Sequence, residues 1–311
     1  EVAIYQALRL DFDIPRAVAL GVLQVVVCAV IATAMVRFAR PVASSATEGR
    51  ASLRPDTAAM GGKACDALWI TLGVLWVAGP LLAVVMEGLT GPVIDVLSRT
   101  AVWQALARSL GVGFGAAVLA LVLGLLLLAT TRDLAVRGAR VALANRLETA
   151  GSLTLVISPV VLGAGLFVLL LPVIPVLDWA LPLAALVNAV VMTPYVLRLV
   201  GPVLRRTAEH HDRLCASLGL NGWARIRLLE WPAARGVVAT ALALTAALAT
   251  GDLTAIALFG TERDATLALL LYRALGSYRM DEAAVLALLL VLSCLAVFVI
   301  IEGVFGDRSR P

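Results

Sequence analysis

Seven long stretches of the 311-residue sequence are apolar and nearly free of charge. A helix rises about 1.5 Å per residue, so about 20 apolar residues cross a hydrocarbon core about 30 Å thick. Lipid cannot satisfy backbone hydrogen bonds, and unbroken apolar runs leave no alternating polar face for a β-barrel. We therefore expect an all-α chain that crosses the membrane about seven times, at residues 17–36, 67–86, 109–129, 151–171, 179–200, 236–259 and 283–301.

The composition argues against an ordinary soluble domain. Hydrophobic residues make up 61% of the chain and charged residues 15%, whereas soluble domains carry about 25% charged residues. The arginines lie between apolar runs and form no single basic patch, so we expect a lipid bilayer as partner and no nucleic acid. The four cysteines lack the spacing of metal or redox sites, so we expect no metal or cofactor bound by this chain.

The distribution of positive charge favours one orientation. When the seven spans are threaded alternately through a membrane, 18 of the 25 lysines and arginines fall on one side. Cytoplasmic loops carry the excess of positive charge, so we expect the N-terminus of this chain outside and the C-terminus inside.

Residues 4–23 resemble residues 271–290 at a constant offset of 267, with Tyr5 matching Tyr272 and Leu23 matching Leu290. Chance similarity between apolar helices is the alternative explanation. A parallel repeat predicts two halves related by an axis along the membrane normal. We expect residues 1–38 to be the last span of a truncated first half, 39–66 a cytoplasmic linker, and 67–311 a second half of six spans.

Small residues and prolines mark the interiors of several spans. Gly111 and Gly115 form a G-x-x-x-G pair with Gly113 between them, a pattern that lets helices approach closely. Pro159 is one of three prolines expected to interrupt spans and to kink them.

The cytoplasmic segment 201–235 is longer than the other loops. Residues 207–218 favour a short helix along the membrane face, which Gly219 and Gly222 break, and Pro232 stops the next turn. Such a helix, fixed at both ends by spans, could contact a cytoplasmic partner. A solvated charged loop is the alternative.

This segment resembles the coupling loop of bacterial ABC-importer permeases, whose consensus is E-A-A-x-x-x-G-x9-I-x-L-P. With Pro232 as the final proline, Gly219 takes the glycine position and Leu229 the isoleucine position, while Arg213-Leu214-Cys215 replaces Glu-Ala-Ala and Trp231 replaces leucine. The resemblance implies that an ATPase binds this loop. The residues assigned to coupling are Glu209, Asp212, Arg213, Ala216, Gly219, Gly222, Leu229 and Pro232.

Residues 213–233, 251–260 and 271–285 resemble the permeases for thiamine and thiamine pyrophosphate more closely than the general motif. That family implies a type I (MetI-like) helical bundle in the bacterial inner membrane, cytoplasmic ABC ATPase subunits that consume ATP, and a periplasmic substrate-binding protein that delivers a thiamine-like molecule. The sequence itself has no nucleotide-binding loop, because the nearest string, GGKAC at 61–65, lacks the earlier glycine and the final Ser or Thr. We expect a transport subunit and not an enzyme.

Few polar residues lie where a substrate could meet them. Asp252 is the only acidic residue inside the expected spans, and it serves either as a counter-charge for a cation or as a helix cap. Asn188 and Thr193 line the path or bond neighbouring helices. Tyr272 and Tyr278 anchor the outer interface or make cation–π contacts with thiamine.

Three other functions compete with thiamine import. An ABC permease for ferric iron or another small ion would share the coupling loop. An ion-coupled secondary transporter would favour ionisable pairs at the membrane midplane, and a membrane enzyme would need clustered acids or histidines. Because only Asp252 lies within the expected spans and the two histidines are adjacent on a loop, the last two functions are disfavoured.

Overall fold

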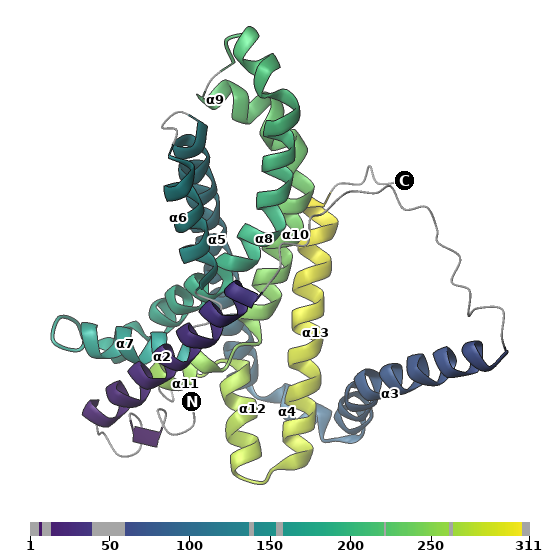
Figure 1. Ribbon diagram of the computed structural model, residues 1–311. Helices are drawn as coiled ribbons and strands as arrows, with labels where there is room; N and C mark the ends of the chain where they lie inside the picture. The colour runs from purple at the N-terminus through teal and green to yellow at the C-terminus, as the bar shows by residue number, and fades with distance from the viewer. Residues whose placement is uncertain are drawn as a thin grey trace.

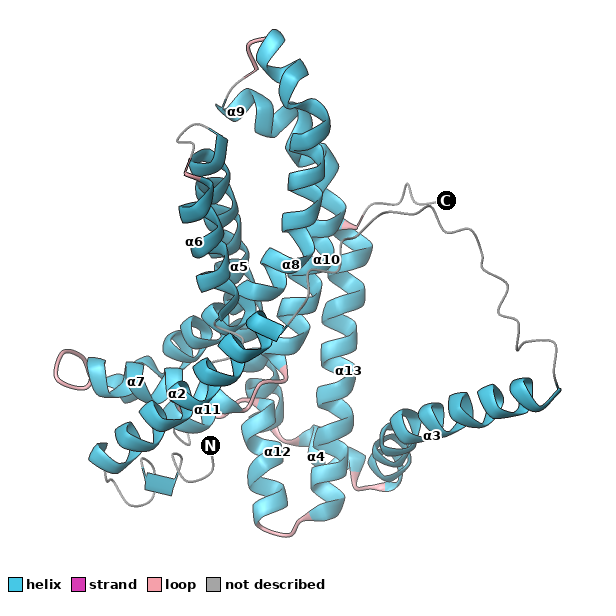
Figure 2. Ribbon diagram, in the orientation of Figure 1, coloured by secondary structure: helices cyan, strands magenta, loops and turns pink. Residues whose placement is uncertain are grey.

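The computed structural model describes residues 6–7, 14–38, 60–136, 140–153, 158–220, 222–260 and 264–306. Throughout these residues every regular element is a helix, which confirms the all-α prediction (Figures 1 and 2). The linker residues 39–59 lie outside the described ranges.

Three long helices form the centre of the molecule: α5 (Thr100–Val136), α8 (Ala180–Ser217) and α10 (Trp231–Thr250). Small side chains allow them to pack closely. Ala116 and Ala120 of α5 and Ala241 of α10 are fully buried in one apolar cluster with Val196 of α8. A Cβ placed on Gly124 of α5 would lie 2.7 Å from Val196 Cγ1, so the glycine is needed for this approach.

The remaining helices surround this centre (Figure 1). On one side, α7 and α11 pack on the core through Phe167 and Phe259, whose ring centroids are 6.1 Å apart. At one end of the bundle lie α4, α12 and the start of α13, and at the other end lies the short helix α9. The bounds are α2 Ile14–Phe38, α3 Met60–Thr90, α4 Val93–Ser98, α6 Val141–Leu153, α7 Pro159–Leu170, η2 Val176–Trp179, α9 Gly222–Arg225, η3 Ile226–Glu230, α11 Thr254–Phe259, α12 Leu267–Gly276 and α13 Met280–Phe305.

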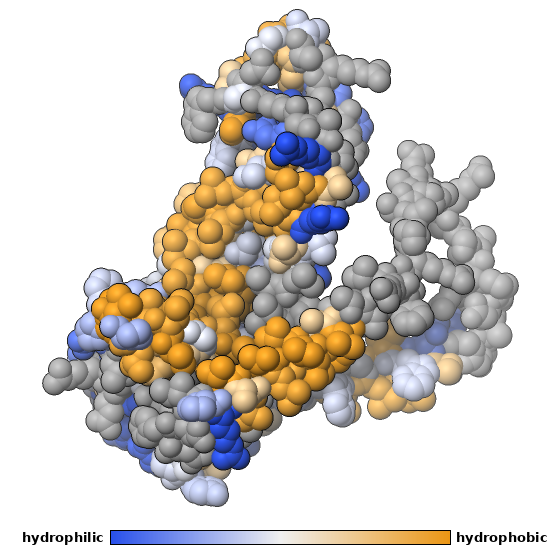
Figure 3. Space-filling view, turned by 60° about the vertical axis from the view of Figure 1, so that its left-hand side comes forward, coloured by the Kyte–Doolittle hydropathy of each residue, from blue (hydrophilic) through white to orange (hydrophobic). Residues whose placement is uncertain are grey.

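Helix α3 projects sideways from the bundle and touches α13 only near its own C-terminal end (Figure 1). Its apolar window has no buried residue, and Trp76 is 84% exposed. The face in Figure 3 carries a band of hydrophobic side chains with hydrophilic ones toward its two ends. Such a surface is expected of helices that face lipid.

Within the described residues, five of the seven predicted spans coincide with helices that are long and apolar enough to cross a membrane, as expected of an integral membrane protein. These helical stretches are Lys63–Thr90, Thr100–Leu134, Ala180–Ala208, Ile226–Phe259 and Met280–Phe305. The first predicted span, 17–36, lies within the 25-residue helix α2, whose described apolar stretch is Val18–Ile31.

The fourth predicted span, 151–171, is wrong in its start and length. Helix α7 begins at Pro159 and has only 12 residues. The Ser158 hydroxyl accepts a hydrogen bond from the Val160 amide at 3.3 Å, and a proline at the first helical position needs no amide partner. Pro159 therefore begins a helix and does not kink one.

Two further boundaries differ from prediction. Residues 60–66 of the predicted linker 39–66 belong to helix α3. The predicted span 236–259 is divided, because α10 ends at Thr250 and α11 starts at Thr254. Asp252 lies in the turn between them.

The predicted G-x-x-x-G pair is not the site of close helix approach. A Cβ on Gly111 or Gly115 would meet nothing within 4 Å, whereas a Cβ on Gly113 would lie 2.9 Å from both Cα and N of Thr250. The close contact between α5 and α10 therefore centres on Gly113.

Candidate functional site

The predicted coupling segment forms the tip of a helical hairpin. The structure contradicts the separate short helix expected at 207–218, because α8 runs unbroken from Ala180 to Ser217 over 38 residues. No glycine or proline lies between Val203 and Leu218, so the helix continues beyond the membrane-length part until a residue stops it. We call residues 207–232 the coupling hairpin.

Gly219 ends α8 and begins the turn at the hairpin tip. Its φ is +65°, a left-handed conformation that glycine adopts without strain. The Leu220 amide donates to the Cys215 carbonyl at 2.9 Å, the six-residue hydrogen bond of a Schellman motif. Gly222, with φ +57°, begins the return. The predicted break at these two glycines is confirmed.

The returning arm contains a π-helical segment. Helix α9 leads into η3 (Ile226–Glu230), and α10 follows with Pro232 in its first turn. Pro232 therefore starts the span and does not end the preceding turn. Leu229 lies half-buried within the π segment. A π turn inserted in a helix often marks a functional site.

The hairpin exposes apolar side chains outside the bundle. They are Leu214, Leu218, Ile226, Leu228 and Trp231, between 41% and 64% exposed. Exposed apolar groups clustered beyond a bundle mark an interaction surface. The backbones of Glu209, Asp212, Arg213 and Ala216 lie on α8 within the hairpin, but their side chains are outside the described part.

Two ionic clusters at this end escaped the sequence analysis. Glu230 accepts hydrogen bonds through Oε1 from Arg225 Nε at 2.9 Å and from Arg132 Nη1 of α5. Glu148 of α6 accepts one from Arg205 Nη1 of α8. Their partners lie up to 98 residues apart in the sequence, so no local pattern could have revealed them.

The predicted pathway residues are distributed over different elements. Asn188 and Thr193 are buried on α8, and Thr193 donates to its own helix at Ala189 O, 2.8 Å away. Thr193 also borders a groove of about 400 Å³ between α5, α6 and α8. Tyr272 on α12 is 46% exposed and Tyr278 is 85% exposed. Among these described residues, no hydrogen bond or ring contact joins any two pathway candidates.

Asp252 has the capping contact that was one of its two predicted roles. Its Oδ2 accepts a hydrogen bond from the Ala255 amide in the first turn of α11 at 3.2 Å. This bond satisfies one of the free amides at the start of that helix. An acid in this turn is thus explained without a substrate.

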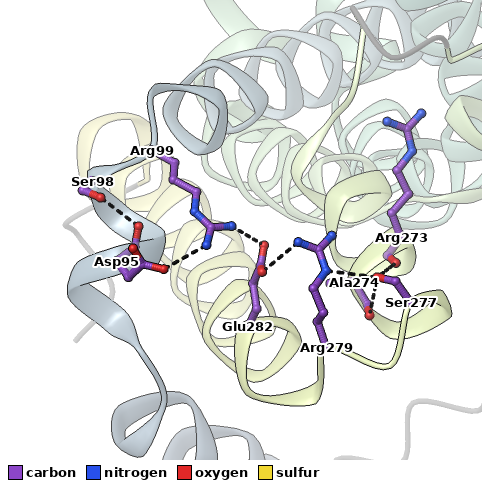
Figure 4. Close-up of polar contacts among 8 residues, drawn as sticks. All are labelled: Asp95, Ser98, Arg99, Arg273, Ala274, Ser277, Arg279 and Glu282. Atoms are coloured by element: carbon purple, nitrogen blue, oxygen red, sulfur yellow. Dashed lines mark hydrogen bonds and ion pairs between the residues drawn. The ribbon is translucent and has the colours of Figure 1, made fainter.

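A third ionic cluster lies at the α12 end (Figure 4). Glu282, in the first turn of α13, accepts from Arg99 Nη1 at 2.8 Å and from Arg279 Nη1 at 3.0 Å, and Arg99 Nη2 donates to Asp95 at 2.9 Å. The hydrogen bond to Asp95, together with the hydrogen bond and charge of Glu282, raises the pKa of Arg99. Arg99 is the single residue between α4 and α5, so the cluster ties this junction to α13.

Comparison with known proteins identifies the family. Residues 134–310, more than half of the chain, match the family model described as the binding-protein-dependent transport system inner membrane component. The chain belongs to this transport family. The matched region contains the whole coupling hairpin, so the hairpin belongs to the family's shared part and is not an appendage.

Several curated relatives of this transport component align over nearly its whole length. It is 40% identical over 310 residues to the thiamine transport system permease protein ThiP of Brucella suis, covering 100% of this chain and 56% of that protein. The ThiP of Escherichia coli is 36% identical, with 100% and 58% covered, and that of Haemophilus influenzae is 32% identical, with 97% and 56% covered. The chain spans just over half the length of these relatives.

Proposed function

We propose that the chain is a membrane-spanning part of an ATP-driven importer for thiamine and its phosphates. The observation that carries this proposal is the coupling hairpin: two left-handed glycines and an apolar tip beyond the bundle, within the region matched by the transport family. The substrate is proposed from the relatives, which are named as thiamine permeases.

The hairpin is proposed to dock on a cytoplasmic ABC ATPase. Its exposed leucines and Trp231 offer apolar surface to a partner, and the sequence lacks a nucleotide-binding loop of its own. The energy for transport would therefore be delivered through this surface. A periplasmic binding protein would deliver the substrate at the opposite, α12 end.

The proposed orientation follows from charge. The hairpin and the other arginine-rich segments lie on the side with 18 of the 25 lysines and arginines, which is cytoplasmic by the positive-inside rule. This orientation places the N-terminus of the chain in the periplasm and the C-terminus in the cytoplasm.

The proposed domain organisation has two halves, with residues 1–38 closing the first half, 39–66 linking, and 67–311 forming the second. The pairing of α2 with α13 supports it, because the repeat offset of 267 residues maps the described residues 14–38 of α2 onto residues 281–305 of α13. Each helix follows a helical segment, at Gln6–Ala7 and in α12. The greater length of the relatives agrees with a further half.

Uptake by a reconstituted transporter tests this function. We expect the full-length permease, with its ATPase and binding protein in proteoliposomes, to accumulate labelled thiamine only when ATP is supplied. Excess unlabelled thiamine pyrophosphate should compete, and ferric iron should not. The variant Gly219→Pro should abolish uptake and weaken ATPase association, because proline cannot adopt the positive φ of this position. ATP-driven iron uptake without thiamine uptake would overturn the substrate, and normal uptake by Gly219→Pro would overturn the coupling role.

A further inference from the structure

The carboxylate of Glu230 is shared by two arginines in a poorly hydrated place. Its side chain is 12% exposed, that of Arg225 13% and that of Arg132 27%. Both arginines donate to the same oxygen, Oε1. Charge-assisted bonds of this kind are stronger than neutral ones, and they are little screened when partly buried.

The three residues come from three different elements. Arg225 ends α9, Glu230 ends the π segment η3, and Arg132 lies four residues before the end of α5. Figure 1 shows α9 turning from the α8–α10 arms toward α5 and α6. The Glu230–Arg132 bond is thus a polar bridge from the returning arm of the hairpin to a helix that the hairpin does not join covalently.

The two hydrogen bonds of Glu230 connect different parts of the structure. The bond to Arg225 stays within one short segment, five residues apart, and can only shape the returning arm. The bond to Arg132 joins that arm to α5 across 98 residues of sequence. If the hairpin is displaced, α8 and α10 must follow through their backbones. Helix α5 packs against both in the core, and at this end Arg132 also ties it to the returning arm.

We propose that Glu230 is a positioning residue that makes α5 move with the coupling hairpin, so that a displacement imposed on the hairpin reaches three central helices. This inference rests on the proposed function. Glu230 occupies the unspecified position of the I-x-L-P motif, between Leu229 and Trp231, so the motif itself does not assign it a role. Glu230 also ends a π segment, and π turns within helices occur frequently at functional sites.

Four glutamine variants separate this role from local structure. They are Glu230→Gln, Arg132→Gln, Arg225→Gln and, as a matched control, Glu148→Gln, which breaks the α6–α8 pair outside the hairpin's returning arm. Each is placed in the full-length permease with its ATPase and binding protein. Uptake per ATP hydrolysed and ATPase association are measured together.

We expect Glu230→Gln and Arg132→Gln to lower uptake per ATP by about tenfold, a usual size for coupling between sites. ATPase association and hydrolysis should persist in both. Arg225→Gln and Glu148→Gln should keep near-normal ratios. If Glu230→Gln fails to insert, Arg132→Gln carries the test, because it leaves Glu230 paired with Arg225. Normal coupling in Arg132→Gln, or equal loss in Arg225→Gln, would overturn the proposal.

A distance measurement makes this test independent of the substrate. Spin labels at Thr130→Cys on α5 and His210→Cys on the hairpin, in a background without the natural cysteines, report whether the two move together. We expect their separation to stay constant on ATP addition in the otherwise unmodified protein and to change in Glu230→Gln. A constant separation in both would refute the bridge even if thiamine proved to be the wrong substrate, and absent thiamine uptake with the expected distances would refute only the substrate.

Discussion

Asp252 shows how one hydrogen bond changes the interpretation of a charged residue in a span. From sequence, an acid at this depth pointed either to a substrate cation or to a helix end. The structure divides the span there and bonds the carboxylate to the Ala255 amide. The position of the break was foreseeable from Gly251, whereas the partner of the side chain was not.

Asparagine at this position separates the two roles. Because Asp252→Asn removes the charge but keeps a hydrogen-bond acceptor, we expect an unchanged KM for thiamine uptake. Asp252→Ala removes the acceptor and should lower stability by about 1 kcal/mol, the usual cost of a lost cap, seen as a lower melting temperature in detergent. A tenfold rise of KM in Asp252→Asn, with stability retained, would assign the counter-charge role instead.

For the individual helices, the sequence predicts which ones exist better than it predicts where they begin and end. Apolar runs located five helices of membrane length, because hydrophobicity is a property of the run itself. The start of α7 at Pro159 and the unbroken length of α8 were missed for opposite reasons. Proline at a helix start and proline inside a helix look alike in sequence, and the continuation of α8 past the apolar run leaves no hydrophobic signal.

In the candidate site, some residues were predictable from the sequence and others were not. Gly219 and Gly222 were predictable as the hairpin turn, because a local conformation demands glycine. The role of Glu230 was not predictable, because it depends on Arg132, which only the packing of the helices brings close. The sequence also did not reveal which glycine of α5 lies against α10, because the spacing of glycines does not determine which face of the helix points toward its neighbour.

Helix packing at Gly113 gives a prediction with internal controls. Gly113→Ala should force α5 from α10, because the added Cβ would lie 2.9 Å from backbone atoms of Thr250. Overpacking of this kind costs about 1–3 kcal/mol. Gly111→Ala and Gly115→Ala, two residues to either side, meet nothing within 4 Å and should melt at or above the wild-type temperature. Equal melting of all three variants in detergent would contradict the observed face of α5.

On the scale of the whole molecule, the two ends of the bundle differ in kind. The α9 end is built from a capped helix end, two glycines with positive φ and a carboxylate shared by two arginines. The α12 end is closed by the Arg99–Glu282 cluster, which ties α4 and α5 to α13 (Figure 4). Under the proposed function, the α12 end would receive the substrate and the α9 end would receive the ATPase.

The orientation of these ends is open to direct measurement. Leu218, at the tip of the hairpin, is 63% exposed, and Tyr278, in the turn between α12 and α13, is 85% exposed, so a cysteine at either position is accessible to a thiol reagent. The positive charge concentrated on the hairpin side favours the cytoplasm. In a cysteine-free full-length permease, we expect Leu218→Cys to react with a membrane-impermeant maleimide only in inverted vesicles. Tyr278→Cys should react only in intact spheroplasts. Reaction of both cysteines from one side would mean that an even number of membrane crossings separates the two positions, which would contradict the proposed topology. The reverse labelling pattern would place the hairpin outside the cell, where no ATPase could reach it.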